Sequence, residues 1–116
     1  MEYETHPPVT DEQTIDTLLA LLRNRYRRDV VDILSEQESS MPLHDLAAVV
    51  ATAETGPESD RASTERTHEV AATLHHIHLP KLDDADIVDY DTETHSVTPG
   101  RATALVALMR SVENGR

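Results

Sequence analysis

The first part of the chain repeats its hydrophobic positions with the period of an α-helix. After a flexible N-terminal arm over residues 1–13, which contains Pro7-Pro8, a helix is predicted to begin behind Asp11 or Thr14, since either residue can cap it. Four apolar residues then follow at the i, i+3, i+4, i+7 spacing of one buried stripe: Ile15, Leu18, Leu19 and Leu22. This stripe requires an apolar partner.

Two more helices are predicted in the next thirty or so residues. Asn24 can cap a helix from Arg25 to about Ser35, and a third helix is expected over His44 to Ala53. Between them, Met41-Pro42-Leu43 is expected to be extended, because proline fixes φ and keeps the residue before it out of the helical region. The inward positions of these helices are predicted to be Tyr26, Val30, Ile33, Leu34, Leu46, Ala47 and Val50.

A fourth helix is predicted from Arg61 or Ser63 to Leu79, where Pro80 should break it and open a further turn as far as Ala85. Its periodicity places Val70, Leu74 and Ile77 toward the core. The opposite face of this helix and its flanks then carry Arg61, Thr64, Glu65, His68, Glu69, Ala72, His75 and His76.

The hydrophobic period then changes to two, which is typical of strands. Residues 87–91 and 95–98 are predicted to form a β-hairpin around a turn at 92–94. Thr98 followed by Pro99 suits the start of a last helix. Its apolar residues are Ala102, Leu105, Val106, Met109 and Val112.

This order of elements predicts a mainly α fold with a small β-hairpin wing, an α+β winged helix-turn-helix with extra N- and C-terminal helices. The arm over 1–13, the winged helix-turn-helix domain over 14–98 and a dimerisation helix with its tail over 99–116 make up one domain, because 116 residues leave room for a single core.

Three stretches resemble a haloarchaeal winged-helix family of small, largely uncharacterised proteins that is related in shape to ArsR-like repressors. They are Leu22 to Arg28, the run L-H-H-I-H-L-P-K-L-D-D-A from Leu74 to Ala85, and the I-V-D-Y-D that follows. The resemblance covers about Ile15 to Thr98 and implies the fold, with function only by class. Where the family pattern has glycine, this chain has Asp86, so the left-handed turn expected there falls on a less favourable residue.

The charge of the chain is −12, and Lys81 is its only lysine. Carboxylates stay hydrated in concentrated salt, whereas lysine stems expose apolar surface, so this composition indicates a halophile. At molar salt the Debye length is about 3 Å, and net charge then weighs little against DNA binding.

A fourth helix that enters the major groove of DNA predicts the function of a homodimeric, sequence-specific transcription regulator. Double-stranded DNA would contact the outward face of that helix, the hairpin turn, and the dense arginine run at the start of the second helix, which consists of Arg23, Arg25, Arg27 and Arg28. The candidate DNA-binding residues are Arg25, Arg27, Arg28, Arg61, Thr64, His68, His75 and His95. Salt bridges to nearby acids are the other interpretation of the arginine run.

The predicted hairpin and the segment that leads into it are acidic, since no basic residue lies between Leu82 and Thr94. The acidic residues there are Asp83, Asp84, Asp86, Asp89, Asp91 and Glu93. Phosphate would be repelled there unless inorganic cations bind this surface. The alternative function is therefore a protein-interaction module that docks another regulator through the acidic hairpin.

Other chemistry is less well supported. His75 and His78 have a spacing that could bind a metal ion in a metal-responsive repressor, but the neighbouring histidines do not converge with them. No catalytic motif is present, so we expect neither an enzyme nor a cofactor. The chain has no cysteine, no stretch long enough to span a membrane and no signal-peptide pattern at its start, so a cytoplasmic location without membrane contact is expected.

The two terminal helices offer more apolar surface than one small core needs, which predicts a symmetric dimer. The expected interface residues are Ile15, Leu18, Leu19, Leu22, Leu105, Met109 and Val112.

Overall fold

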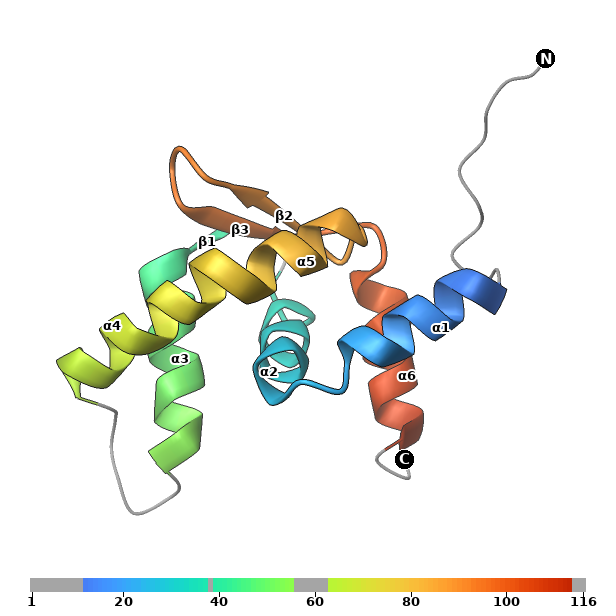
Figure 1. Cartoon of the computed structure of the whole chain (residues 1–116), viewed down its shortest axis with the longest axis horizontal. Coiled ribbons are helices and arrows are strands. Elements are labelled where there is room, and N and C mark those ends of the chain that lie inside the picture. Colours follow the sequence, from blue (N-terminus) through green and yellow to red (C-terminus); the bar gives the residue numbers. More distant parts are fainter. Residues whose placement is uncertain (1–11, 38, 56–62, 114–116) are drawn as a thin grey trace.

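The protein is mainly helical and has one small antiparallel sheet (Figure 1). The computed structural model describes residues 12–37, 39–55 and 63–113. Its elements are α1 (Glu12–Leu21), α2 (Arg25–Leu34), β1 (Met41–Pro42), α3 (Leu43–Thr55), α4 (Thr64–Thr73), the π-helical turn η1 (Leu74–His78), α5 (Leu79–Asp84), β2 (Val88–Asp91), β3 (Ser96–Pro99) and α6 (Thr103–Glu113). The predicted arm lies outside the described residues, apart from its last two, which belong to α1.

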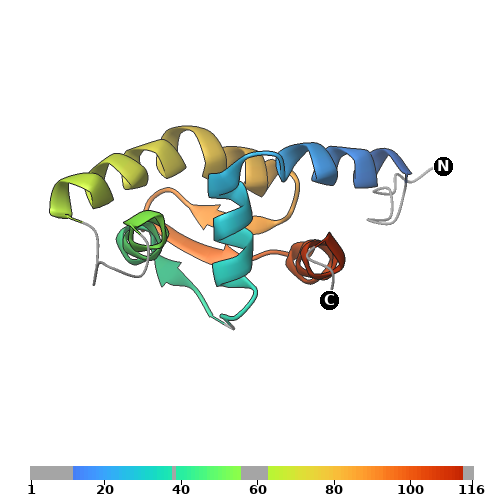
Figure 2. The ribbon, with the colours of Figure 1, turned by 90° about the horizontal axis from the view of Figure 1, so that it is seen from below.

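The sheet has three strands in the order β1-β3-β2, all antiparallel. The hairpin of β2 and β3 was expected, and the extended piece at Met41 completes the sheet by pairing with Val97. The backbone N–H of Leu43 donates to the carbonyl of His95, so α3 begins directly against the hairpin turn. Figure 2 shows α4, η1 and α5 as one continuous layer over this sheet.

The core is formed by residues from all six helices and from the sheet. Most of its predicted members are fully buried: Leu18, Val30, Leu34, Leu46, Ala47, Val50, Val70, Leu74, Leu82, Ala102 and Val106. Asn24 caps α2 as expected, because its side-chain oxygen accepts a hydrogen bond from the backbone of Tyr26 at 2.8 Å. No helix in the described ranges is long and apolar enough to cross a membrane.

The prediction for the fourth helix was wrong in its second half. Helical structure continues through Pro80, and the side chain that faces the core is His78, whereas Ile77 is 48% exposed. The reason is the π turn, in which Leu79 donates its backbone N–H to the carbonyl of Leu74, five residues back. Such a turn contains one residue more than an α turn, so it delays the inward position by one residue and makes room for the proline ring.

The start of the last helix was also predicted wrongly. Pro99 is the final residue of β3, opposite Val88, and α6 begins only at Thr103. The intervening turn is fastened to the chain before β2, because the backbone of Gly100 donates to Ile87 and the Thr103 hydroxyl donates to the same carbonyl. The expected left-handed turn is confirmed at Asp86, whose φ is 63°.

Gly100 lies so close to this turn that no side chain fits. A Cβ atom there would stand 2.4 Å from the carbonyl oxygen of Asp86 and 2.8 Å from the carbonyl carbon of Ile87, both in the backbone. We expect Gly100→Ala to lower the free energy of unfolding by roughly 1–3 kcal/mol, measured by urea denaturation. Asp86→Gly is the matched control and should change it by less than about 1 kcal/mol, because glycine tolerates positive φ. Equal stability of Gly100→Ala and the wild type would show that the turn can accommodate a Cβ atom at position 100, which would contradict this prediction.

Candidate functional site

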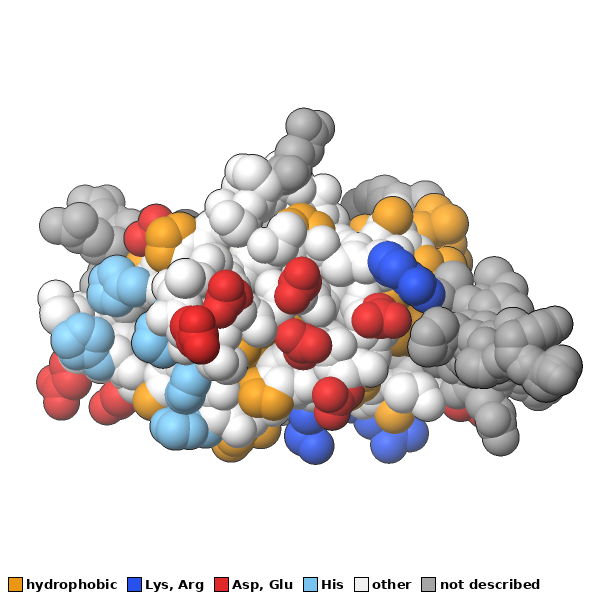
Figure 3. Space-filling view, turned by 90° about the horizontal axis from the view of Figure 1, so that it is seen from above, with side chains coloured by type: hydrophobic (Ala, Val, Ile, Leu, Met, Phe, Trp, Pro, Cys, Tyr) orange, Lys and Arg blue, Asp and Glu red, His pale blue; other side chains and the backbone are white. Residues whose placement is uncertain are grey.

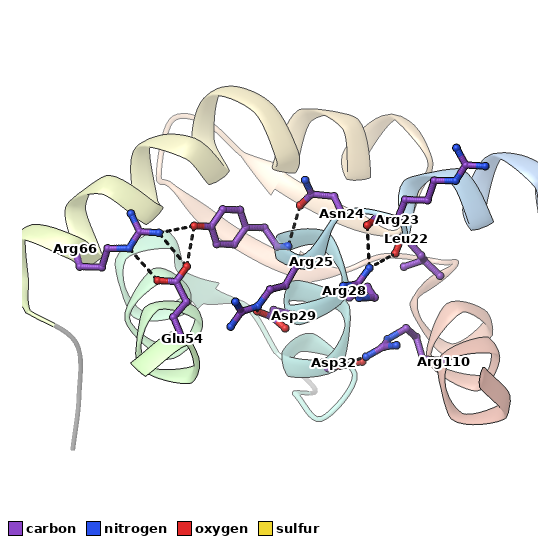
Figure 4. A network of polar contacts seen from close by, with 11 residues as sticks. Leu22, Arg23, Asn24, Arg25, Arg28, Asp29, Asp32, Glu54, Arg66 and Arg110 are labelled. Atoms are coloured by element: carbon purple, nitrogen blue, oxygen red, sulfur yellow. Dashed lines mark hydrogen bonds and ion pairs between the residues drawn. The ribbon is translucent and has the colours of Figure 1, made fainter. Parts of the chain in front are cut away.

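Most arginines at the start of α2 bond to other groups of the same chain (Figure 4). Arg28 donates through one guanidinium nitrogen to the carbonyl oxygens of Leu22 (2.8 Å) and Arg23 (2.9 Å). These carbonyls follow α1, where helical carbonyls lack partners and a positive charge is favourable. Arg28, at the start of α2, therefore stabilises the end of α1, which accounts for a basic residue where the dipole of α2 disfavours it.

Two other arginines of the run also have partners. Arg27 donates from Nε to Nδ1 of His78 at 3.3 Å, and Arg25 pairs with Asp29 at 3.6 Å. The Arg25 side chain is 54% exposed, so its charge is still accessible. Arg25 forms an ion pair with an acid, as the salt-bridge interpretation expected, whereas Arg27 bonds to an imidazole and Arg28 to backbone carbonyls. Of the three, Arg25 is the more accessible candidate for DNA contact.

Another arginine, Arg66 on α4, was not among the residues predicted from the sequence. It donates to both carboxylate oxygens of Glu54 on α3, at 2.9 and 3.0 Å, and to the hydroxyl of Tyr26 on α2 at 2.7 Å (Figure 4). The Tyr26 hydroxyl in turn donates to Glu54 at 2.8 Å. Arg66 lowers the pKa of the Glu54 carboxyl, and the Tyr26 hydrogen bond lowers it further. The hydrogen-bonded cluster of Tyr26, Glu54 and Arg66 therefore joins α2, α3 and α4.

The outward face of α4 agrees with its prediction. Thr64 at the helix start and His68 one turn later are exposed, whereas the candidate Arg61 lies outside the described residues. Ser63 caps the helix by accepting a hydrogen bond from the backbone of Arg66. Glu65 and Glu69 flank this face, and Glu69 pairs with Arg66 at 2.9 Å. The described part of α4 thus offers hydroxyl and imidazole groups but no free arginine.

His75 and His95 come together where η1 meets the hairpin turn. Their ring centroids are 5.5 Å apart, and His76 lies 4.7 Å from His75 on the same turn. Nδ1 of His75 is hydrogen-bonded to the Tyr90 hydroxyl at 2.6 Å, and His95 has the positive φ of a tight turn, 57°. The sequence indicated His75 and His95 separately, but their proximity depends on the packing of the hairpin against η1.

The acidic hairpin combines structural and free carboxylates. Asp83 accepts a hydrogen bond from the backbone of Tyr90 at 2.8 Å, so it fixes β2 to α5. Asp91 accepts from the backbone of Glu93 and Thr94 across the turn, and these hydrogen bonds lower the pKa of its carboxyl. Asp89 and Glu93 are exposed without such bonds. Figure 3 shows carboxylates beside histidines on this face.

The two candidate metal ligands do not converge. His75 turns to Tyr90, whereas the buried His78 lies against Tyr26, with ring centroids 5.5 Å apart, and accepts from Arg27. In the part of the chain that the structure describes, no group of three or more His, Cys, Asp or Glu side chains could hold a metal ion. The arrangement therefore gives the metal-responsive hypothesis no support.

The candidate dimer residues fall into two sets. Leu18 and Leu22 are buried in the core of the single chain, and Leu105 and Met109 pack against that core, so these side chains are largely used within the protomer. Leu19 and Val112 are 43% and 67% exposed, as is Leu108 at 62%, while Ile15 is half-buried. α1 and α6 lie at the same end of the molecule (Figures 1 and 2).

The fold is thus a helical α+β domain whose outward helix and hairpin present polar side chains. Comparison with protein-family models matches residues 19–98 to the DUF7344 family, a domain of unknown function, and the chain belongs to this family. The matched region begins inside α1 and ends one residue before the end of β3. No curated protein and no solved structure gave a significant match.

Burial of His78 makes the stability of the protein depend on pH. Desolvation lowers the pKa of the His78 imidazole, and the nearby Arg27 charge lowers it further. When the pH falls below about 6.5, the ordinary value for histidine, the unfolded chain binds a proton before the folded chain does. Stability is therefore lost as the pH falls, at no more than about 1.4 kcal/mol per pH unit for this one group.

Thermal unfolding followed by circular dichroism should show this loss, and His78→Gln should reduce it. His76→Gln is the matched control, because His76 is exposed on the same turn and should keep the dependence of the wild type. An identical pH dependence in His78→Gln and the wild type would contradict the assignment to His78.

Proposed function

We propose that the protein is a homodimeric, sequence-specific DNA-binding regulator with a winged helix-turn-helix fold. The observation on which this depends is the packing of α3 against α4, with the β2–β3 hairpin beside them (Figure 1). In a winged helix, the helix after the turn enters the major groove, and the hairpin approaches the neighbouring backbone. α4 is the element in that position here, and its outward face is polar.

The proposed contacts differ from those of a basic DNA-binding protein. Thr64 and His68 on α4 would reach base edges or phosphates, and His75 and His95 would approach the backbone. Arg25 and Arg61 are the arginines proposed for phosphate contact. Arg27 and Arg28 act chiefly as positioning residues, since their side chains bond within the chain.

The homodimer is proposed to form through the exposed apolar side chains at the α1 and α6 end, Leu19, Leu108 and Val112. The distance of this end from α4 in Figures 1 and 2 leaves the outward face of α4 uncovered. A two-fold dimer would present two copies of α4 to half-sites about one helical turn of DNA apart.

A protein-interaction module is the second candidate function, and the acidic hairpin favours it. Asp89 and Glu93 are exposed, and Glu65 and Glu69 lie beside the outward face of α4. Such a surface attracts a basic partner and repels phosphate. In that case the same fold would dock another regulator without contacting DNA.

Selection from a library of duplexes with a randomised centre, in molar KCl, tests the DNA-binding proposal. We expect recovery of a motif with two-fold symmetry. His68→Glu should weaken binding to that motif at least about tenfold, because it places a carboxylate in the groove. Thr17→Glu adds the same charge on exposed α1, at the other end of the molecule (Figure 1), and should bind as the wild type does. Failure to enrich any sequence over a range of salt would reject the proposal and favour the interaction module.

A further inference from the structure

Five histidines lie on one surface formed by the start of α3, by α4 and η1, and by the turn of the hairpin. We call this surface the histidine face, and its members are His44, His68, His75, His76 and His95. The rings of His44 and His68 are 5.9 Å apart, and those of His76 and His95 lie within 5.5 Å of His75. His68 and His75 are seven residues apart on one helical run, so they share a side of it. Figure 3 shows histidines gathered at one end of the view.

The histidine face coincides with the surface proposed to contact DNA. It includes the outward face of α4 and the turn of the hairpin, which in a winged helix face the groove and the backbone. Among the described residues, the rings of His68, His76 and His95 form no hydrogen bond with another side chain, so their nitrogens are accessible to a ligand. His75 uses Nδ1 for Tyr90 and leaves Nε2 for a ligand.

The permanent charges around the histidine face do not attract phosphate. Carboxylates come from each element packed there: Asp45 from α3, Glu65 and Glu69 from α4, and Asp89, Asp91 and Glu93 from the hairpin. The guanidinium of Arg66, the arginine of the described part of α4, is bonded to Glu54 and Glu69. The charge of Arg66 is thus offset by two carboxylates, and the imidazoles are the members of the histidine face that can add positive charge.

Histidine is the side chain whose charge ordinarily changes near neutral pH, and a neighbouring phosphate favours its charged form. The Tyr90 hydroxyl can hydrogen-bond to Nδ1 of His75 whether or not that nitrogen carries a proton. It donates to an unprotonated Nδ1 and accepts from a protonated one. The pKa of the Asp91 carboxyl is lowered chiefly by the backbone hydrogen bonds from Glu93 and Thr94, and the nearby His95 contributes last.

We propose that DNA phosphates bind at the histidine face and that His68, His75, His76 and His95 take up protons on binding, so that affinity for DNA falls as the pH rises through neutrality. This inference rests on the proposed function, because it names the groups that attract DNA to the same surface. Each proton taken up changes the dissociation constant by up to about tenfold per pH unit. Tyr90 acts as a positioning residue for His75.

The test is the dissociation constant of the full chain for a fluorescent duplex, either the selected motif or a duplex of random sequence, measured by anisotropy across neutral pH. Salt is held constant, and a chelator is present so that no metal ion bridges histidine and phosphate. The wild type should bind more weakly as the pH rises. The variant His68→Gln, His75→Gln, His76→Gln, His95→Gln should lose most of this dependence while keeping the circular dichroism spectrum of the fold.

If the fourfold variant does not fold, the double variant His68→Gln, His76→Gln is used, since both side chains are exposed, and it should lose part of the dependence. Thr17→Gln, on exposed α1 and outside the histidine face, is the control and should keep the pH dependence of the wild type. Tyr90→Phe should alter the pH profile without removing binding at low pH.

The outcomes separate the two proposals. Binding whose dissociation constant does not change with pH, or a pH dependence that survives the loss of all four imidazoles, overturns the histidine assignment and leaves the DNA-binding regulator intact. Absence of binding at every pH overturns both.

Discussion

The π turn at Leu74–His78 is the constraint on which the rest of the structure depends. Its extra residue brings His78 into the core beside Tyr26 and lets the helix pass Pro80 without a break. Leu79 and Leu82 can then continue the core that Leu74 begins, and α5 packs on β2. With a regular α turn, Ile77 would point toward the core. The residues after it would then turn different side chains toward the core.

The same turn divides the histidines between the inside and the surface. His78 points toward α2 and takes a hydrogen bond from Arg27, while His75 on the other side of the run reaches Tyr90 in the hairpin. The helical run is thus attached on one side to the arginine-rich start of α2 and on the other to the sheet. Tyr26 links it further to Glu54 and Arg66, so the orientation of α4 is set by both packing and charge. A surface that must fit a rigid partner benefits from this fixed orientation.

Much of the fold could be predicted from the sequence, because local signals agree with the final packing. Asn24 marks the start of α2, the change of period marks the hairpin, and the left-handed turn falls at Asp86 as expected. The π turn could not be predicted, because Pro80 indicates only a disturbance of the helix, and the choice between a break and a π turn depends on packing against α2 and the sheet. The start of α6 was misplaced for a related reason: a Thr-Pro pair suits a helix start locally, but here Pro99 ends a strand at the register that the hairpin imposes.

The candidate site was harder to predict than the fold, because its residues have alternative partners. The sequence offers Arg28 as a phosphate contact, but in the fold its guanidinium donates hydrogen bonds to the carbonyls that follow α1. Arg66 gave no signal of its own, since its partners Tyr26 and Glu54 are far away in sequence. The terminal helices also have alternative partners. Leu18 and Leu22 were predicted to lie in a dimer interface, but they are buried in the core of the single chain. The sequence shows which side chains are able to bind a ligand, and packing decides which of them have no partner within the chain.

The use of arginines within the chain fits the proposed DNA recognition if it takes place in concentrated salt, which the acidic, lysine-poor composition predicts. Counterion release by arginine and lysine contributes little there, because binding that relies on it weakens steeply as salt rises. At molar salt only groups within about 3 Å of each other interact strongly. Hydroxyl and imidazole groups act at this range through hydrogen bonds, and the acidic hairpin loses most of its long-range repulsion. An imidazole also gains its charge where a phosphate lies against it, so positive charge would form at the contact and add little elsewhere to an acidic surface.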